Sequence, residues 1–295
     1  MGVILKYLGV ENVHVMSGAM NTYSAAGYDM ETGVNKATKT DLGITKPENP
    51  DVIDTISEVK KEIKNDDYVV IDTRTADEWN GKSSGYSYHD LNGRIPGTVL
   101  SECGKGYSSS VFYYRHADKT MRTANGIENM WAGQNIDKNK HLVFFCGSGW
   151  RAAETTWDAW VMGLDASLYS DGWIGWSNEG NPYIRNGKTY ELNKATGKEV
   201  NISAIKAAKP TSVKAKAGSK KATITWKKTS KATYYKVYQK SGSKYKVVKI
   251  TKSSKAVVKK LKKGKTYTFK VRGYQTINGS KIYTGYGKTV KVKAK

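Results

Sequence analysis

The sequence predicts two modules of different fold class: an α/β domain with a mainly parallel sheet, followed by an all-β sandwich. The hydrophobic pattern alternates between helical and strand periods over residues 50–183, then changes to period two from Thr211. The charge changes in the same region, because residues 1–200 carry 21 basic and 26 acidic residues, whereas residues 201–295 carry 28 basic residues and no Asp or Glu. A chain of 295 residues is long enough for about two domains.

The N-terminal residues carry a weak internal repeat. Leu5–Met20 (LKYLGVENVHVMSGAM) and Ala159–Ile174 (AWVMGLDASLYSDGWI) share a helix end, a glycine, a short strand and a second glycine before another helix, with Gly9 and Gly163 in equivalent places. An offset this long indicates a duplicated domain rather than a solenoid unit. We therefore expect residues 1–35 to be the tail of a truncated first copy, with chance similarity of two short segments as the alternative.

Residues 50–183 provide the pattern of the α/β domain. Apolar residues at helical spacing predict helices at Ile56–Ile63, near Ile127–Trp131 and after Arg151, and short apolar runs predict strands at Tyr68–Ile71, His141–Phe145 and Asp165–Ser170. Residues 184–208 are polar and weakly patterned, and we interpret them as a linker. Residues 209–295 then form the second domain.

Cys146 stands at the end of a predicted buried strand and is followed by a glycine-rich turn and the start of a helix. The backbone N–H groups of this turn are expected to surround the sulfur and, with the positive end of the helix, to stabilise a thiolate there. The loop residues are Gly147, Ser148, Gly149, Trp150 and Arg151. Arg151 supplies a cation that can hold an anionic substrate. An inert cysteine in a glycine turn is the alternative.

Four motifs resemble the rhodanese domain in their order and spacing. They are Asp72-Thr73-Arg74 after a strand, the Gly93–Val99 segment GRIPGTV, the CGSGWR loop at Cys146, and the Tyr169–Trp173 segment YSDGW. The resemblance implies the rhodanese fold and an arrangement in which a tandem enzyme carries its active cysteine in the second copy. The CGSG sequence resembles that of mercaptopyruvate sulfurtransferases, whereas the Trp-Arg ending is closer to shorter loops of other members.

The resemblance implies a sulfurtransferase that uses Cys146 as its nucleophile. Thiosulfate or 3-mercaptopyruvate would donate a sulfane sulfur to form a Cys146 persulfide, and a thiol or cyanide would accept it. No metal, nucleotide or organic cofactor is implied. Possible supporting residues are Asp72 and Arg74, which resemble a structural ion pair, and Arg115, His116 and Arg122, which are candidates for donor contacts or solvated loop residues. Cys103 is a candidate resolving thiol.

Two alternatives remain for the α/β domain. A phosphatase or arsenate reductase on the same fold is disfavoured by loop length, because cysteine phosphatases place five residues between Cys and Arg, whereas four separate Cys146 from Arg151. The other alternative is a non-catalytic rhodanese-like binding or redox module in which Cys146 is retained for packing.

The C-terminal module resembles the fibronectin type III domain. Trp226 lies in the second predicted strand, and Tyr267 occupies the tyrosine-corner position in LKKGKTYTFKV. With 26 Lys, one Arg and no acidic residue, residues 209–295 are expected to bind a polyanionic cell-wall or surface polymer. Nucleic acid is the rival ligand, disfavoured because no binding motif is present and lysine dominates over arginine. A soluble spacer is the third possibility.

Lysine-rich copies of this domain resemble those of surface and secreted proteins of Gram-positive bacteria, which implies an extracellular or cell-surface location. The first residues show no signal-peptide pattern, so we expect that signal to lie in a missing N-terminal segment. No apolar run is long enough for a transmembrane segment.

Overall fold

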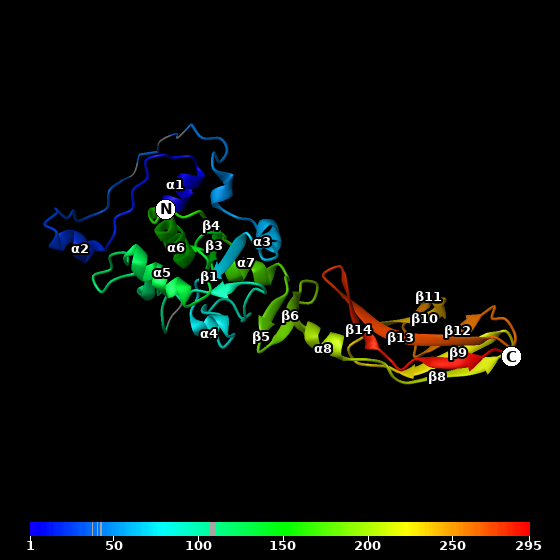
Figure 1. Cartoon of the computed structure of the whole chain (residues 1–295). Helices are drawn as coiled ribbons and strands as arrows, with labels where there is room; N and C mark the ends of the chain where they lie inside the picture. The colour runs from blue at the N-terminus through cyan, green and yellow to red at the C-terminus, as the bar shows by residue number, and fades with distance from the viewer. Residues whose placement is uncertain (37, 40, 42, 107–109) are drawn as a thin grey trace. The chain divides into compact units, whose positions relative to one another are not determined.

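The computed structural model describes residues 1–36, 38–39, 41, 43–106 and 110–295, and it divides into two compact units, Met1–Gly187 and Lys188–Lys295. The first unit is built on a four-stranded parallel sheet in the order β2-β1-β3-β4 (Figure 1). Its strands are β1 (Tyr68–Asp72), β2 (Val99–Leu100), β3 (His141–Phe145) and β4 (Ala166–Leu168). This sheet and its flanking helices confirm the predicted α/β fold.

Short helices connect the strands of the first unit. They are α3 (Ile56–Glu62), α4 (Ala76–Trp79), α5 (Ala124–Ala132), α6 (Trp150–Val161) and α7 (Gly172–Asn178), with 3₁₀ turns η1 (Pro50–Val52) and η2 (Phe112–Tyr114). Side chains from Thr55, Thr75 and Thr123 cap α3, α4 and α5 by accepting a backbone N–H of the first turn. Such caps explain why helices as short as these begin at defined residues.

The central strand β3 is buried on both faces of the sheet. Leu142 and Phe144 pack in one apolar core with Trp131 of α5 and with alanines of α6. Phe145 points to the opposite face, where its ring lies 6.1 Å from that of Tyr169. A strand buried on both sides reads as an unbroken apolar run, which is why HLVFF predicts it so clearly.

The N-terminal segment forms α1 (Gly2–Tyr7) and α2 (Met20–Ala25), and α1 contacts α6. Gly9 and Gly163 both have positive φ after a helix, at +96° and +76°. The strand expected near residues 12–15 does not form, whereas its counterpart β4 does. The reason is physical: β4 pairs with β3, and an extended segment without a neighbouring strand is not stable alone.

Residues 184–208 differ from a plain linker, because they contain regular structure. They hold part of β5 (Tyr183–Arg185), the antiparallel pair β6 (Lys188–Asn193) and β7 (Lys198–Asn201), and α8 (Ile202–Ala207). The Asn201 side chain caps α8 by accepting the Ala204 N–H at 2.8 Å. The isoleucines of α8 pack against Ile277. The strands escaped prediction because their apolar residues are few and short strands of polar composition resemble loops.

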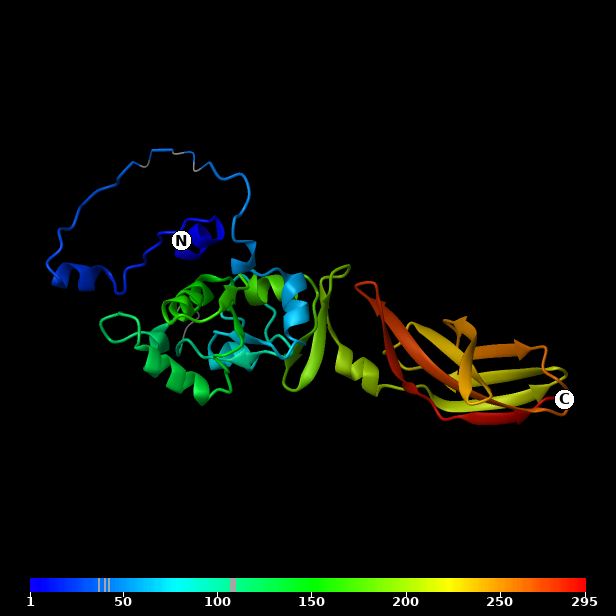
Figure 2. The same ribbon diagram turned by 45° about the horizontal axis from the view of Figure 1, so that its top comes forward.

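The rest of the second unit is an all-β sandwich, as predicted, and Figure 2 shows its strands in yellow to red. One sheet has the order β12-β9-β8 and the other β11-β10-β13-β14, with β15 also paired to β13. The strands are β8 (Thr211–Gly218), β9 (Lys221–Lys227), β10 (Tyr234–Ser241), β11 (Lys244–Thr251), β12 (Lys255–Lys259), β13 (Thr266–Ile277), β14 (Ser280–Tyr286) and β15 (Val290–Lys293).

The sandwich core contains the residues that the alternating pattern points inward. Ile224, Trp226 and Phe269 are buried together, and Trp226 lies 5.5 Å from the ring of Tyr235. The Tyr267 hydroxyl accepts the backbone N–H of Lys262 at 2.9 Å, which is the hydrogen bond of a tyrosine corner. Across the described part of the chain, no helix combines the length and apolar character needed to cross a membrane.

Candidate active site

Cys146 lies directly after β3, where the loop Cys146–Gly149 leads into α6. The first turn of α7 holds the loop through two backbone hydrogen bonds. The Trp173 N–H donates to the Cys146 carbonyl at 2.8 Å, and the Ile174 N–H donates to the Gly147 carbonyl at 3.0 Å. The Cys146 side chain is fully buried. The carboxyl end of a parallel strand is where open α/β sheets place their ligands.

Two glycines are required by the geometry of this loop. Gly149 precedes α6 with φ of +86°, and a Cβ there would come within 2.8 Å of the Ser170 carbonyl oxygen. A Cβ on Gly147 would come within 2.1 Å of the Tyr86 ring. The glycines therefore let the backbone turn sharply and let Tyr86 approach the loop.

The Arg151 guanidinium, which the sequence suggested would hold an anionic substrate, is already paired with a carboxylate. It is buried and donates two hydrogen bonds of 2.8 Å to the carboxylate of Glu78 in α4. Glu78 is the capping-box residue of α4, also accepting the Thr75 N–H, and burial of that carboxylate demands a cation. Burial opposes its ionisation, but the hydrogen bonds and charge of Arg151, the charge of Arg74 and the Thr75 N–H together outweigh this and hold the pKa of Glu78 below its usual range. Arg151 thus braces the loop against α4.

Tyr86 is a site residue that the sequence analysis missed. Its hydroxyl accepts a hydrogen bond of 3.4 Å from Arg151, and its ring lies against Gly147. Burial, and then the negative charge of Cys146, raise the pKa of the Tyr86 phenol, so the group stays protonated at neutral pH. Tyr86 lies in the irregular segment after α4, and the Ser-Gly-Tyr sequence there indicates a turn but not a site residue.

A hollow of about 380 Å³ lies above the loop. Its lining residues are Tyr86, Tyr88, Val111, Arg115, Ser148, Trp150, Arg151 and Glu154. The expected donor contact Arg115 does reach this hollow, but its guanidinium is paired with the Glu154 carboxylate of α6. Trp150 is 85% exposed at the rim. The hollow therefore offers aromatic rings, hydroxyls and paired charges rather than free cations.

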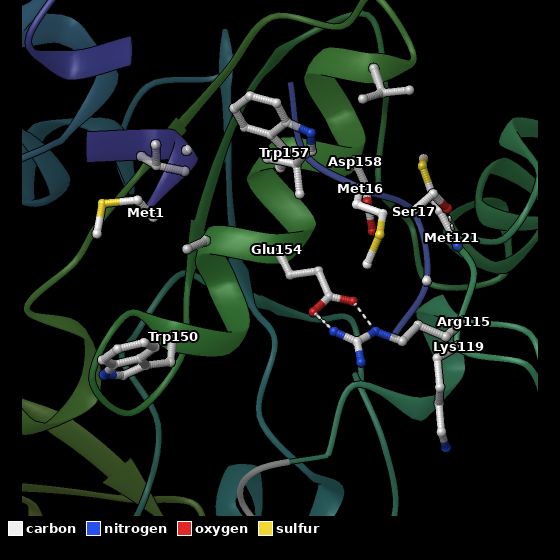
Figure 3. A pocket seen from close by; sticks show the side chains of 16 residues that line it. Met1, Met16, Ser17, Arg115, Lys119, Met121, Trp150, Glu154, Trp157 and Asp158 are labelled. Atoms are coloured by element: carbon white, nitrogen blue, oxygen red, sulfur yellow. Dashed lines mark hydrogen bonds and ion pairs between the residues drawn. The ribbon is translucent and has the colours of Figure 1, made fainter. Parts of the chain in front are cut away.

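A second hollow of about 340 Å³ adjoins the first and shares Arg115, Trp150 and Glu154 with it. Figure 3 shows the Arg115–Glu154 pair at its centre and Met16 of the N-terminal segment beside α6. Asp158 also lines it, and burial followed by the Glu154 charge raises the pKa of that carboxyl to about 7. The N-terminal residues thus contribute to the site region, which no sequence motif indicated.

The remaining predicted residues lie outside the two hollows. Asp72 and Arg74 form a fully buried bidentate pair, and Arg74 also donates to the Gly93 carbonyl at 2.8 Å, so this pair ties β1 to the GRIPG segment. Arg122 stands at the start of α5, and His116 is exposed in a turn. Neither lines the hollow above Cys146.

Cys103 is buried, and burial raises the pKa of its thiol. A thiol held in this protonated form is a poor nucleophile, so its role as a resolving residue stays a prediction. Within the described residues, no group of His, Cys, Asp and Glu side chains is arranged to hold a metal ion.

Family models identify both domains. Residues 55–179 match the model of the rhodanese-like domain, and residues 208–285 match that of the fibronectin type III domain. The chain carries a rhodanese-like domain. The match spans all four motifs that resembled this family, the CGSGWR loop among them, and the sandwich that follows is a fibronectin type III domain.

Named relatives point to sulfur chemistry. The chain is 33% identical over 179 residues to the thiosulfate sulfurtransferase YnjE of Escherichia coli (strain K12), covering 60% of this chain and 41% of that protein. The wild-type structure of EanB has a TM-score of 0.59 at 36% identity, over 62% of this chain and 43% of EanB. An anaerobic ergothioneine biosynthesis enzyme from Chlorobium limicola, solved with trimethyl histidine, has a TM-score of 0.58 at 35% identity, over 62% and 44%. The chain spans less than half of each relative.

Proposed function

We propose that this chain is a rhodanese-type sulfurtransferase in which Cys146 carries the transferred sulfur. The observation that supports this most directly is the position of Cys146, directly after the carboxyl end of β3 and at the start of the loop whose Ser148, Trp150 and Arg151 line a hollow. The loop and the start of α6 stabilise negative charge on sulfur, which both the thiolate and the persulfide need. The thiosulfate sulfurtransferase relative supports the same reaction.

The reaction has two balanced steps. The Cys146 thiolate attacks the outer sulfur of thiosulfate, the sulfur–sulfur bond of the donor breaks, and sulfite leaves with the electron pair. A thiolate or cyanide then attacks the terminal sulfur of the persulfide, which restores the Cys146 thiolate and forms a new persulfide or thiocyanate. With 3-mercaptopyruvate as donor, the thiolate attacks its sulfur, the carbon–sulfur bond breaks, and pyruvate leaves as its enolate with the electron pair and then takes up a proton.

The structure disfavours a phosphatase. A phosphate ester would need the Arg151 guanidinium for its oxygens, but that group is buried and bound to Glu78. A non-catalytic binding or redox module stays open as the alternative, since a buried thiol suits it as well.

Mass spectrometry after incubation with thiosulfate or 3-mercaptopyruvate separates these possibilities. We expect one added sulfur on the intact protein, lost on treatment with cyanide, and no addition in Cys146→Ser, whose hydroxyl cannot form a persulfide. Because the two side chains are nearly the same size, circular dichroism and thermal unfolding of that variant should match the unaltered protein. An adduct that persists in Cys146→Ser, or absence of any adduct with either donor, would contradict the proposal.

A second acceptor is favoured by the lining of the hollow. Tyr86, Tyr88 and Trp150 surround it, and aromatic rings suit a trimethylammonium group. The Chlorobium limicola relative was solved with trimethyl histidine. Incubating the persulfide form with trimethyl histidine and seeking a product heavier by one sulfur tests this acceptor against thiols and cyanide.

We also propose that the fibronectin type III module holds the enzyme on an anionic surface polymer outside the cell. Residues 209–295 contain 26 lysines, one arginine and no Asp or Glu, so diffuse attraction to polyanions follows. Binding of the full chain to Gram-positive wall preparations at low salt, with release at about 0.5–1 M salt, is the expected result. Failure to bind any polyanion would reduce the module to a spacer.

A further inference from the structure

One face of the larger sheet in the second unit alternates tyrosines with cations. Its residues, here called the tyrosine–cation face, are Lys236, Lys270, Arg272, Tyr274, Tyr283 and Tyr286. Phe269 and Val271 point into the core, so the alternate residues of β13 point outward. The register places Lys236 opposite Arg272 and Arg272 opposite Tyr286, which gathers side chains from three strands into one patch.

The cations of this face are held by tyrosines. The Lys236 ammonium donates to the Tyr283 hydroxyl at 2.7 Å, and the Arg272 guanidinium lies 3.8 Å from the centre of the Tyr283 ring. The Lys270 ammonium lies 3.8 Å from the centre of the Tyr286 ring. Because residues 201–295 contain no carboxylate side chain, these cations are ordered without being neutralised. Ordered, uncompensated cations are prepared to bind an anion at a lower entropic cost.

The same contacts argue against a ligand that stacks on the rings. Arg272 lies over the Tyr283 ring and Lys270 over the Tyr286 ring, and Tyr274 is only 6% exposed. Single-stranded nucleic acid is bound through open aromatic faces on which bases stack. This face offers ammonium, guanidinium and hydroxyl groups instead, which favours a ligand without bases.

The donors also favour phosphate over carboxylate. Lys236, Tyr283 and Arg272 converge on one point of the face, and each can donate a hydrogen bond. A phosphate diester has acceptor oxygens that can take donors from several directions, whereas a carboxylate is planar and suits one bidentate partner. We infer that the tyrosine–cation face binds a base-free phosphodiester polymer of the polyol-phosphate type. The inference rests on the proposed polyanion binding and names the surface and ligand chemistry.

The test compares two charge-matched double variants of the full chain. Lys236→Gln with Arg272→Gln removes two charges from the face, and Lys216→Gln with Lys255→Gln removes two from exposed positions of the other sheet. Calorimetric titration with poly(glycerol phosphate) should show at least about tenfold weaker binding for the face variant and less than about twofold for the control. Tyr283→Phe, which keeps the ring and removes the hydroxyl, should weaken binding about threefold.

Each of the other possible results would refute a specific part of the inference. Equal losses in the two double variants would mean that binding is diffuse, which refutes the face but leaves the proposed surface attachment intact. Equal or tighter binding of oligo(dT) or of hyaluronate, matched in number of charges, would refute the base-free phosphate ligand. No binding of the unaltered chain at low salt would refute both. Thermal unfolding of each variant shows that it is folded, and Tyr283→Phe decides the matter if the face variant is not.

Discussion

Replacing Arg151 by leucine should destabilise the first unit strongly, because it leaves a buried carboxylate without its cation. The side chain of Glu78 is 1% exposed and would lose both 2.8 Å hydrogen bonds from the guanidinium. Removing one partner of a buried ion pair costs about 3–5 kcal/mol. Urea unfolding at pH 7.5 should therefore show a loss of this size in the free energy of unfolding.

The stability of the Arg151→Leu variant should also depend on pH in a defined direction. Without Arg151, burial raises the pKa of Glu78 above its unfolded value, so the folded state binds a proton that the unfolded state releases. Stability of the variant then falls as pH rises through the interval between those two values. The deficit relative to the unaltered protein should shrink towards pH 5.

The double variant Arg151→Leu with Glu78→Gln is the control, because it removes the stranded charge. It should recover part of the lost stability, with a coupling energy of about 1–3 kcal/mol between the two positions. A different result would refute the bracing role: unchanged unfolding of Arg151→Leu together with a raised KM for thiosulfate would show that Arg151 captures the donor.

Two further predictions concern residues that line the hollows. Tyr86→Phe should lower the turnover of sulfur transfer by about tenfold to hundredfold, since it removes a protonated donor beside the loop; unchanged turnover would show that Tyr86 only fills space. Asp158→Asn should raise stability at pH 8 by roughly 2–4 kcal/mol but hardly at pH 4, because burial lifts the Asp158 pKa to about 7 and ionising it opposes folding at higher pH. Equal unfolding free energies of the two proteins across this range would contradict that.

The sequence predicted the strands that are buried on both faces and the loop that follows one of them. HLVFF is typical of a core strand, and the glycines after Cys146 indicate a tight turn. The alternation around Trp226 and Tyr267 similarly predicted the sandwich. These features are local, since the hydrophobic period and the backbone conformation that a glycine allows can both be read from neighbouring residues.

The features that escaped prediction depend on contacts between distant segments. Arg151 looked free because its partner Glu78 lies 73 positions away and appears in the sequence only as a helix-capping residue. Tyr86 belongs to an irregular segment, so no hydrophobic periodicity indicates that its ring lies against Gly147. The hairpin of β6 and β7 was missed because pairing rather than composition stabilises it.

Salt concentration should affect the activities of the two domains to different extents. Near the hollow, Arg151 is neutralised by Glu78 and Arg115 by Glu154, so the proposed sulfur transfer would rely on the loop amides and the start of α6 to stabilise an anion on Cys146. Such short-range groups in a buried site are screened little by ions. The lysines of residues 201–295 are mostly exposed and this segment contains no Asp or Glu, so their attraction to a polyanion falls as the screening length drops to about 3 Å at 1 M salt. Between 0.05 and about 1 M sodium chloride, sulfur transfer by the full chain should change less than about threefold, whereas attachment to an anionic polymer should be lost. A parallel collapse of both activities would show that free cations of the second domain take part in capturing the donor.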